Sequence, residues 1–300
     1  MKLYLGIDGG QSSTTALIGD ETGKVLGEGR SGPCNHVGEA ERRDKFFAAV
    51  GDSVRLAAQQ AGVNPLFEGV CAGFSGGAED KDALTRELIR ADRYLITHDA
   101  HIALAGAAAG EPGIVVIAGT GSIAYGRNED GNSARAGGWG YVFGDEGGAF
   151  DIARQAVRAI VRQEEGWGQP TMLRDVLLGA SGCESANQLL HRCYTAEYPR
   201  ERVAAWAAIV DEVARTGDPV AMSILDGAAQ ALAMIASAVR RRLFTDGESA
   251  NIYPIGGTFA SEPLLERFRM LAELVGENSV LTPRMSPLQG ALLEARTLGR

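Results

Sequence analysis

The sequence predicts an α/β fold built from two related lobes, and three observations indicate it. Strands followed by helical stretches occur twice along the 300 residues, as is typical of α/β proteins. Two segments, starting near residues 3 and 113, open alike with a strand, a Gly/Ser/Thr turn, a second strand and an acidic turn containing glycine. The chain is also too long for one ordinary core. We expect one lobe over 1–112, against which a helix at 287–300 packs, and a second lobe with a helical insertion over 113–286.

The individual elements follow from the spacing of apolar residues between turn formers. The expected strands span 3–7, 14–18, 24–28, 69–73, 94–97, 113–118, 123–127 and 251–255. The expected helices span 39–61, 81–91, 99–109, 147–165, 203–215, 219–243, 262–275 and 288–298. We expect no transmembrane helix, because no run of about 18 apolar residues occurs.

The composition excludes several classes of function. Apolar residues make up 45% of the chain and charged residues 22%, which is ordinary for a globular protein. The net charge is −9 and only residues 240–242 form a basic cluster, so no nucleic-acid partner is expected. The four cysteines form no CxxC pair and the chain starts directly with a strand rather than a signal peptide. We therefore expect a cytoplasmic protein with free thiols and no membrane association.

The loop between the first two strands could bind a phosphate group. Gly9 and Gly10 allow the backbone to approach an anion closely, and Ser12 and Ser13 offer hydroxyl donors. Asp8, at the end of the first strand, could hold a hydrated Mg²⁺ ion. A plain tight turn is an equally good interpretation of these residues alone.

Two further glycine turns suggest contacts with a nucleotide. The segment 119–124 matches the G-x-G-x-x-A fingerprint of dinucleotide-binding folds, but a strand and a turn follow it where that fingerprint needs a helix. A second phosphate-binding hairpin, with Thr120 and Gly121, fits better. Gly256 and Gly257 follow a strand and could line a base or ribose, although an ordinary strand-to-helix turn would look the same.

Asp99 stands between a strand and a helix. An aspartate at such a position is usually a helix N-cap. The functional alternative is a general base that accepts a hydroxyl proton during phosphoryl transfer. The neighbouring His98 and His101 suggest a metal, but the further ligands that zinc requires cannot be named.

The segment 137–148 combines many glycines with aromatic residues and two acids. Asp145 and Glu146 precede a helix and could simply cap it. Because the segment directly follows the second hairpin, it could instead bring carboxylates to the hydroxyl groups of a sugar.

Taken together, these segments resemble the superfamily of sugar kinases and actin-like ATPases, and within it the BadF/BadG/BcrA/BcrD-type ATPases and the N-acetylglucosamine kinases. The resemblance covers nearly the whole chain, and the GGWG…GDEG segment is its most specific part. It is carried by GIDGGQSST at 6–14, GPCNH at 32–36, FSGG at 74–77, HDA at 98–100, AGTGS at 118–122, GGWGYVFGDEGG at 137–148 and IGGTF at 255–259. The family implies two ribonuclease-H-like (actin-like ATPase) lobes with the active site in the cleft between them.

The resemblance also implies a role for each matching residue. Asp8 would hold Mg²⁺ through water, and Asp99 would deprotonate the 6-hydroxyl of the sugar. The residues expected to contact ATP are Gly9, Gly10, Ser12, Ser13, Thr120, Gly121, Gly256 and Gly257. Those expected to surround the sugar are Asn35, His36, Ser75, Gly76, Asp99, Ser122, Gly138, Trp139 and Asp145.

Some departures and alternatives stay open at this point. The first loop has Gln11 and Ser12 where the family usually has a glycine and a threonine, and the Cys-rich zinc motif of ROK-type kinases is absent. The resemblance favours an N-acetylglucosamine kinase, with glucosamine and N-acetylmuramic acid as other acceptors. An ATPase activator of the BadF type and a nucleotide-binding regulator without turnover are the other classes. A homodimer is one assembly compatible with the resemblance.

Overall fold

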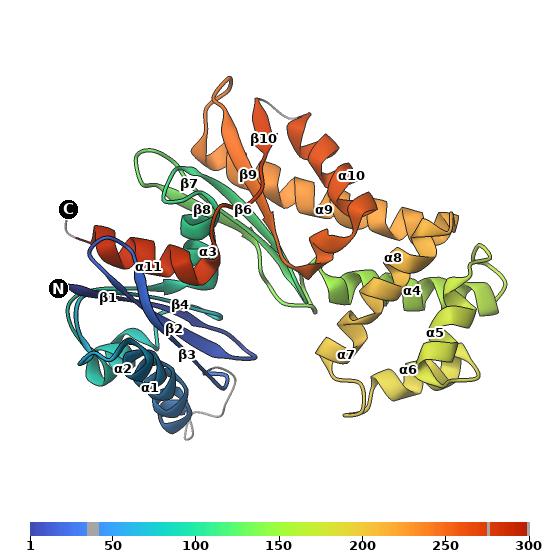
Figure 1. Ribbon diagram of the computed structural model, residues 1–300. Helices are drawn as coiled ribbons and strands as arrows, with labels where there is room; N and C mark the ends of the chain where they lie inside the picture. The colour runs from blue at the N-terminus through green and yellow to red at the C-terminus, as the bar shows by residue number, and fades with distance from the viewer. Residues whose placement is uncertain (35–41, 275–276, 299–300) are drawn as a thin grey trace. The chain divides into compact units, whose positions relative to one another are not determined.

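The computed structural model describes residues 1–34, 42–274 and 277–298, and the chain divides into two compact units (Figure 1). Unit 1 comprises residues 1–113 and 282–300, and unit 2 comprises residues 114–281. The sequence placed these boundaries at 112/113 and 286/287. Each unit contains its own five-stranded sheet with helices packed on it, so the predicted two-lobed α/β fold is confirmed.

The sheet of unit 1 has the strand order β3-β2-β1-β4-β5. Its strands are β1 (Leu3–Gly9), β2 (Thr14–Asp20), β3 (Val25–Ser31), β4 (Leu66–Phe74) and β5 (Arg90–His98). The first three strands form an antiparallel meander, whereas β4 and β5 run parallel to β1. Gly9 pairs with Phe74, and Phe74 pairs with His98. The three parallel strands therefore end together at one edge of the sheet.

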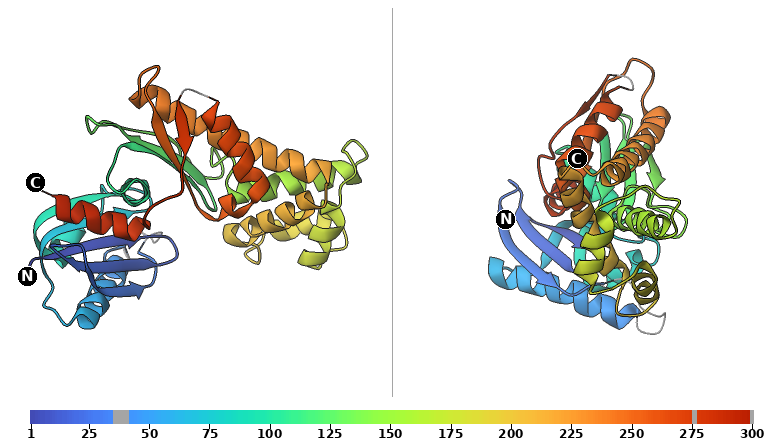
Figure 2. Two further views of the ribbon diagram at one scale, coloured as in Figure 1. Left: turned by 45° about the horizontal axis from the view of Figure 1, so that its top comes forward. Right: turned by 90° about the vertical axis from the view of Figure 1, so that its right-hand side faces the viewer.

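Helices cover both faces of this sheet (Figure 2). One face packs against α1 (Arg42–Ala61), and the other packs against α3 (Asp99–Ala107) and α11 (Pro287–Thr297). Alternation along β1 sends Leu5 and Ile7 to the core under α1, and Tyr4 to the smaller core under α11. The short α2 (Asp82–Leu88) lies beside β5.

Unit 2 repeats this strand order as β8-β7-β6-β9-β10. Its strands are β6 (Gly113–Ala118), β7 (Ser122–Arg127), β8 (Ser133–Gly137), β9 (Ala250–Ile255) and β10 (Asn278–Val280). β7 and β8 are antiparallel, and β9 runs parallel to both β6 and β10. The duplication that the paired turns indicated is thus a duplication of sheet topology.

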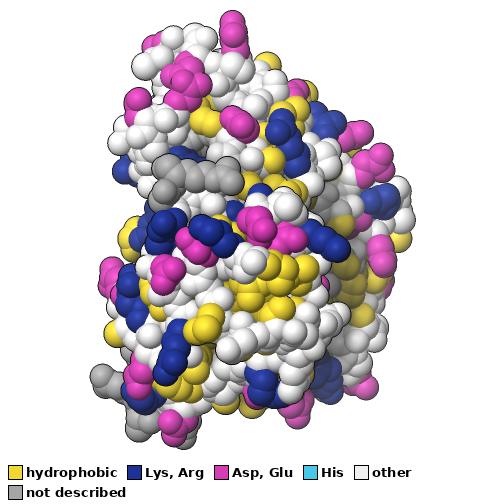
Figure 3. Space-filling model, turned by 60° about the vertical axis from the view of Figure 1, so that its left-hand side comes forward, with side chains coloured by type: hydrophobic (Ala, Val, Ile, Leu, Met, Phe, Trp, Pro, Cys, Tyr) yellow, Lys and Arg dark blue, Asp and Glu magenta, His cyan; other side chains and the backbone are white. Residues whose placement is uncertain are grey.

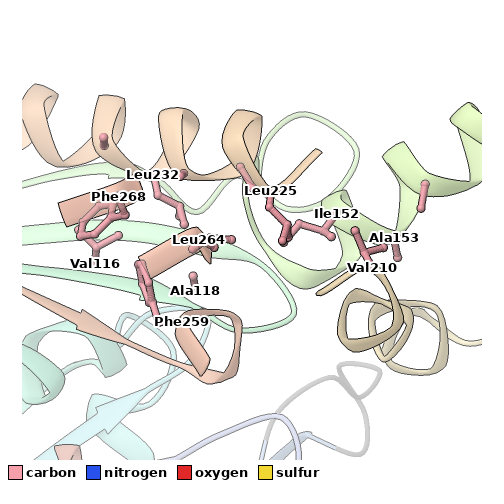
Figure 4. Close-up of a cluster of buried hydrophobic side chains, with 14 of the residues drawn as sticks. Val116, Ala118, Ile152, Ala153, Val210, Leu225, Leu232, Phe259, Leu264 and Phe268 are labelled. Carbon is pink, nitrogen blue, oxygen red and sulfur yellow. The ribbon is translucent and has the colours of Figure 1, made fainter. Parts of the chain in front are cut away.

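The helices of unit 2 enclose the larger of the hydrophobic cores. They are α4 (Ala149–Glu164), α5 (Leu173–Ser181), α6 (Ala186–Cys193), α7 (Arg200–Ala204), α8 (Trp206–Arg215), α9 (Pro219–Leu243), the short 3₁₀ helix η1 (Gly257–Ala260) and α10 (Glu262–Glu273). In Figure 4, Ile152 of α4 and Leu225 of α9 point toward one another, and Phe268 of α10 lies beside Val116 of β6. The insertion therefore shares one continuous core with the sheet.

Several elements differ from the sequence prediction. Strands β8 and β10 and helices α5 and α6 were not predicted, because β8 lacks β-branched residues, β10 is very short, and α5 and α6 are short helices. The expected helix at 203–215 is two helices, α7 and α8. Helix α4 starts after Gly148 rather than at Gly147, whose φ of +77° is incompatible with a helix.

Helix α9 bears on the expectation that no helix spans a membrane. Among the described residues it is the one helix long and apolar enough to span a bilayer. However, Leu225, Leu232 and Val239 bury one face of α9 in the core of unit 2. Such a helix passes the same length and composition test when it is the core helix of a globular unit.

Charged side chains of both signs are interspersed on the surface. On the face shown in Figure 3, Lys and Arg side chains alternate with Asp and Glu side chains and do not form a field of one sign. The face in this view therefore carries no extended basic patch.

We predict opposite effects for two glycines of unit 1. A Cβ atom at Gly29 of β3 would lie 2.0 Å from the carbonyl oxygen of Ser53 in α1, whereas a Cβ atom at Gly51 in α1 would meet only Leu88 at 3.6 Å. Gly29→Ala should therefore separate helix from sheet and strongly lower the midpoint of urea unfolding. Gly51→Ala should raise stability by about 0.5–1 kcal/mol, because glycine disfavours helix interiors. Equal effects of the two substitutions would contradict this packing.

Candidate active site

The parallel strands of unit 1 bring three functional side chains to one edge of the sheet. Asp8 lies near the end of β1, Ser75 directly follows β4, and Asp99 directly follows β5. The backbone N–H of Ser75 donates to the carbonyl of Gly9 at 3.0 Å, which joins two of these strand ends. Ligands of open α/β sheets bind at the carboxyl ends of the strands. The geometry therefore assembles a polar site from residues far apart in sequence.

Asp99 is held in a defined orientation. Its Oδ2 accepts a hydrogen bond from the hydroxyl of Ser75 at 3.0 Å, and its Oδ1 accepts from the N–H of Ala100 at 2.8 Å. The N-cap of α3 is His98, whose Nδ1 accepts from the N–H of His101 at 3.2 Å. Asp99 is thus the first residue of the helix rather than its cap. Its partly exposed carboxylate is oriented and available to a substrate hydroxyl.

Asp8 lies in an unfavourable environment for a negative charge. Burial, and secondarily repulsion by the carboxylate of Asp99, raise the pKa of Asp8 to about 6. A buried acid that is costly to ionise, with a second carboxylate nearby, forms a favourable site for a cation. The oxygen donors fit Mg²⁺, which binds through one or two carboxylates together with water and phosphate oxygens. No cluster of three or more acidic, His or Cys side chains that could hold a metal occurs among the described residues.

The first glycine loop is compact, and packing explains part of its composition. The N–H of Gly10 donates to the carbonyl of Ser13 at 2.9 Å, and Arg30 donates to the hydroxyl of Ser13 at 3.3 Å. A Cβ atom at Gly9 would lie 2.3 Å from the ring of Phe74, so this glycine is required by the core whether or not a ligand binds. Ser12 is exposed at the tip of the loop.

The segment that positions Ser75 contains a residue that the sequence reasoning missed. Gly76 and Gly77 both have positive φ, at +80° and +97°. The buried ammonium group of Lys81 donates to the carbonyl of Gly77 at 3.0 Å and to Asp80 at 2.9 Å. A lysine near the start of a helix gives no sequence signal for this role. Lys81 stabilises the turn that carries the orienting serine.

Two of the predicted sugar contacts, Asn35 and His36, lie outside the described residues. Of the other predicted residues in unit 1, the polar side chains of Asp8, Ser75 and Asp99 gather at the edge where β1, β4 and β5 end.

In unit 2 the second glycine loop is fixed by the start of α4. The N–H groups of Ala149 and Phe150 donate to the carbonyls of Gly119 and Thr120 at 2.8 and 3.1 Å. The hydroxyl of Thr258 also donates to the carbonyl of Gly119, at 3.2 Å. These first-turn N–H groups of α4 are therefore engaged with the loop rather than directed at a ligand. The arrangement fixes the position of Thr120.

Asp145 forms a partly buried ion pair that the sequence did not predict. Its Oδ2 lies 2.6 Å from a guanidinium nitrogen of Arg200, which comes from α7 in the helical insertion. Asp145 is buried and has a φ of +63°, a strained conformation for a residue with a side chain. A Cβ atom at Gly121 would lie 2.2 Å from this carboxylate oxygen. The ion pair therefore packs directly on the second glycine loop.

The segment between β8 and α4 is fixed by hydrogen bonds to Ser122, whereas its aromatic side chains are exposed. The buried hydroxyl of Ser122 donates to the carbonyl of Glu146 at 2.6 Å, and the N–H of Gly138 donates to the carbonyl of Ser122 at 2.9 Å. Trp139 and Phe143 are 67% and 86% exposed. The hydroxyl of Ser122 is thus used to position this segment, whereas the aromatic side chains are accessible to a ligand.

The third glycine turn has one constrained and one open position. Gly256 has a φ of +111°, and a Cβ atom there would lie 2.3 Å from the carbonyl of Ala118. No atom lies within 4 Å of a Cβ atom placed at Gly257. Gly256 is therefore required by the junction of β9 with β6, and Gly257 leaves space beside the backbone.

A family model and three similar proteins each match nearly the whole chain. The model of the BadF/BadG/BcrA/BcrD ATPase family matches residues 5–295. The chain is 30% identical over 305 residues to the N-acetylmuramic acid/N-acetylglucosamine kinase of Clostridium acetobutylicum, with 99% of each chain covered. It is 28% identical over 320 residues to the N-acetyl-D-glucosamine kinase of Dictyostelium discoideum, with 98% of each covered. The crystal structure of a candidate N-acetylglucosamine kinase from Chromobacterium violaceum is similar with a TM-score of 0.76, at 25% identity and 98% coverage of each chain.

The environment of Asp8 predicts a pH-dependent stability. Its pKa is raised on folding, so between about pH 4 and 6 the folded chain retains a proton that the unfolded chain releases, and the free energy of unfolding falls as pH rises by on the order of 3 kcal/mol. Asp8→Asn removes this term. In urea titrations with EDTA, the variant should gain stability over the wild type at about pH 7.5 and lose that advantage near pH 4. An advantage that does not change with pH would show that Asp8 ionises freely.

The contact between Gly121 and Asp145 predicts a contrast within one loop. Gly121→Ala should expel the carboxylate of Asp145 from its place and lower the thermal midpoint of unfolding by several degrees, because a displaced ion pair leaves charge buried. Gly119→Ala is the matched control, since nothing lies within 4 Å of its added Cβ atom. Unfolding midpoints within a degree or so of each other for the two variants would rule out the contact.

Proposed function

The chain belongs to the BadF/BadG/BcrA/BcrD ATPase family, and we propose that it is an ATP-dependent kinase that phosphorylates the 6-hydroxyl of an amino sugar, with N-acetylglucosamine as the preferred acceptor. The observation that supports this most directly is the convergence of Asp8, Ser75 and Asp99 at the carboxyl ends of parallel strands. Phosphoryl transfer needs an acid that binds the metal ion of ATP and a second, oriented acid that accepts the proton of the acceptor hydroxyl.

Asp99 is the proposed general base. Ser75 holds its Oδ2 and the N–H of Ala100 holds its Oδ1, so the carboxylate presents a fixed lone pair to the acceptor. It accepts the proton of the 6-hydroxyl as that oxygen bonds to the γ-phosphorus, and the bond from this phosphorus to the bridging oxygen of ADP breaks. Positioning and charge neutralisation supply most of the rate in such reactions.

Asp8 is the residue proposed to hold Mg²⁺, through water. When bound, the ion neutralises charge on the phosphates of ATP. The loops around Ser12, Ser13 and Thr120 are proposed to donate to phosphate oxygens, and the open space beside Gly257 to accept part of the adenosine. Four further glycines are proposed to contribute through their small size, which permits these loop conformations, rather than by donating hydrogen bonds to ATP. They are Gly9, Gly10, Gly121 and Gly256.

For the sugar we propose contacts from Asn35, His36, Ser75, Gly76, Gly138 and Trp139. Asp145 and Ser122 belong to this group by resemblance, and their partners in the structure indicate how they would act. The ion pair with Arg200 and the hydrogen bond to Glu146 fix the segment around Trp139. N-acetylmuramic acid and glucosamine remain alternative acceptors, because one acyl or lactyl group is discriminated by pocket shape.

The cysteines argue against the function of an iron–sulfur ATPase activator. Such a protein needs thiols at the surface to ligate a cluster between two chains. All four cysteines are free, and Cys34, Cys71 and Cys183 are buried. Burial raises the pKa of the Cys71 thiol, so this side chain is a poor metal ligand in the folded unit. A cytoplasmic location, which rests on the free thiols, and a homodimeric assembly, which rests on the resemblance, complete the proposal.

The proposal predicts how two substitutions affect turnover. Asp99→Asn should lower kcat with N-acetylglucosamine by about 10²–10⁴-fold and leave ATP binding intact, because the general base is lost and the phosphate site is not. Ser75→Ala should lower kcat less and should also shift the pH dependence of kcat, because Asp99 loses its orienting donor.

The assay couples ADP release to a panel containing N-acetylglucosamine, glucosamine, N-acetylmuramic acid and glucose. Wild-type ADP release that no sugar stimulates would refute the kinase. If Asp99→Asn turned over as fast as the wild type, sugar phosphorylation would still stand as the function, but Asp99 would not be its general base.

A further inference from the structure

Unit 2 contains a pocket of about 660 Å³ between α4 and α9, and no role above uses it. Its walls are one side of α4 from Asp151 to Arg162, the turn at 167–169 and the N-terminal half of α9. Such a volume lies within the range of small-molecule sites, roughly 300–1,000 Å³. Asp8 and Asp99 belong to unit 1, so this pocket uses none of the side chains proposed for phosphoryl transfer.

A glycine in the middle of α9 faces this pocket. Gly227 interrupts a helix of 25 residues, where glycine costs about 0.5–1 kcal/mol relative to alanine. Close packing does not explain it, because no atom lies within 4 Å of a Cβ atom added there. Any larger side chain at this position would project into open space. Gly227 therefore preserves pocket volume at the expense of helix stability.

The chemistry of the pocket is that of a sugar site. Trp167 lies at its rim with 65% of its surface exposed, and Arg162 covers the ring at 4.9 Å from its centroid. Gln155, Gln169 and Ser223 supply polar groups, while Ile152 and Ile224 supply an apolar wall. A pyranose has an apolar face that packs on aromatic rings and a rim of hydroxyls that need hydrogen-bonding partners.

The charge of the pocket limits the ligand further. Glu146 lines it and is exposed, and its carboxylate has no hydrogen-bond or ion-pair partner in the part of the chain that the structure describes. The neighbouring Asp151 is already engaged, because its oxygens accept from Arg154 at 2.6 Å and from the N–H of Gly147 at 3.1 Å. The guanidinium of Arg162, which also lines the pocket, lies over the ring of Trp167. The accessible carboxylate of Glu146 repels a phosphorylated ligand and attracts a hydroxyl or ammonium group.

We propose that this pocket is a second saccharide-binding site, which takes an unphosphorylated amino sugar with its ring against Trp167 and a hydroxyl or amino group on Glu146. The site is linked to the segment at 145–148. Glu146 is the residue whose carbonyl holds Ser122, and Asp151 holds the N–H of Gly147. A ligand in the pocket therefore contacts the residues that fix the second glycine loop, so occupancy couples to binding at that loop.

The test is isothermal titration of the full chain with glucosamine, N-acetylglucosamine and glucosamine 6-phosphate, without ATP. Gly227→Leu fills the pocket, and Gly227→Ala is the matched control that adds one methyl group. Thermal unfolding establishes that both variants are folded. Ser223→Tyr fills the pocket from the preceding turn of α9 if Gly227→Leu does not fold.

The proposal predicts that the pocket-filling variant binds one equivalent of an unphosphorylated amino sugar fewer per chain than the wild type, or binds it at least about tenfold more weakly. Gly227→Ala should keep that equivalent, Trp167→Ala should lose it, and glucosamine 6-phosphate should show no difference among the variants. The difference in sugar binding between the variants is measured without ATP and does not depend on the kinase reaction. It can therefore be measured even if the proposed kinase function is wrong. Equal stoichiometry and affinity in wild type and Gly227→Leu would overturn the site. So would a variant that changes the sedimentation of the protein but not its sugar binding, because the pocket would then be a contact between two chains.

Discussion

The parallel pairing of β1, β4 and β5 is the constraint on which the proposed chemistry depends. Their register ends all three strands at one edge, so the carboxylate of Asp99 lies close enough to Asp8 to raise its pKa. Burial and this repulsion make ionised Asp8 costly in the folded chain. A site that holds two acids under such conditions is suited to a cation and a polyphosphate, which relieve the repulsion when they bind. Stability is thus reduced where the proposed chemistry takes place.

Around this edge, a series of hydrogen bonds sets the geometry. Lys81 holds the turn of two positive-φ glycines, that turn places Ser75, and Ser75 orients Asp99. Unit 2 has the same strand order but a different local arrangement, in which α4 and the partly buried ion pair of Asp145 with Arg200 fix the second glycine loop. In both units, glycines lie where a Cβ atom would collide with a neighbouring group, as Gly9 and Gly121 do.

Much of the fold followed from local sequence patterns, because strands such as β1 and β6 are apolar runs bounded by glycine turns. The repeated opening of the two halves indicated the duplicated topology. Short elements were not predicted, because the five residues of β8 and the three of β10 are too few to show an alternation of apolar and polar residues. The strand-end acids could be proposed from their positions and the family resemblance. Lys81 and Arg200 could not, because each acts through a contact that only the folded chain creates.

The central claim is that this chain transfers the γ-phosphoryl group of ATP to the oxygen of the 6-hydroxyl group of an amino sugar. Phosphorus NMR of a reaction containing the protein, ATP, Mg²⁺ and N-acetylglucosamine tests it most directly. The account predicts a new phosphomonoester signal, coupled to the two protons on C6, that grows as the γ-phosphate signal declines and ADP accumulates. Inorganic phosphate as the sole new phosphorus product besides ADP would contradict it and would identify the protein as an ATPase without a sugar acceptor.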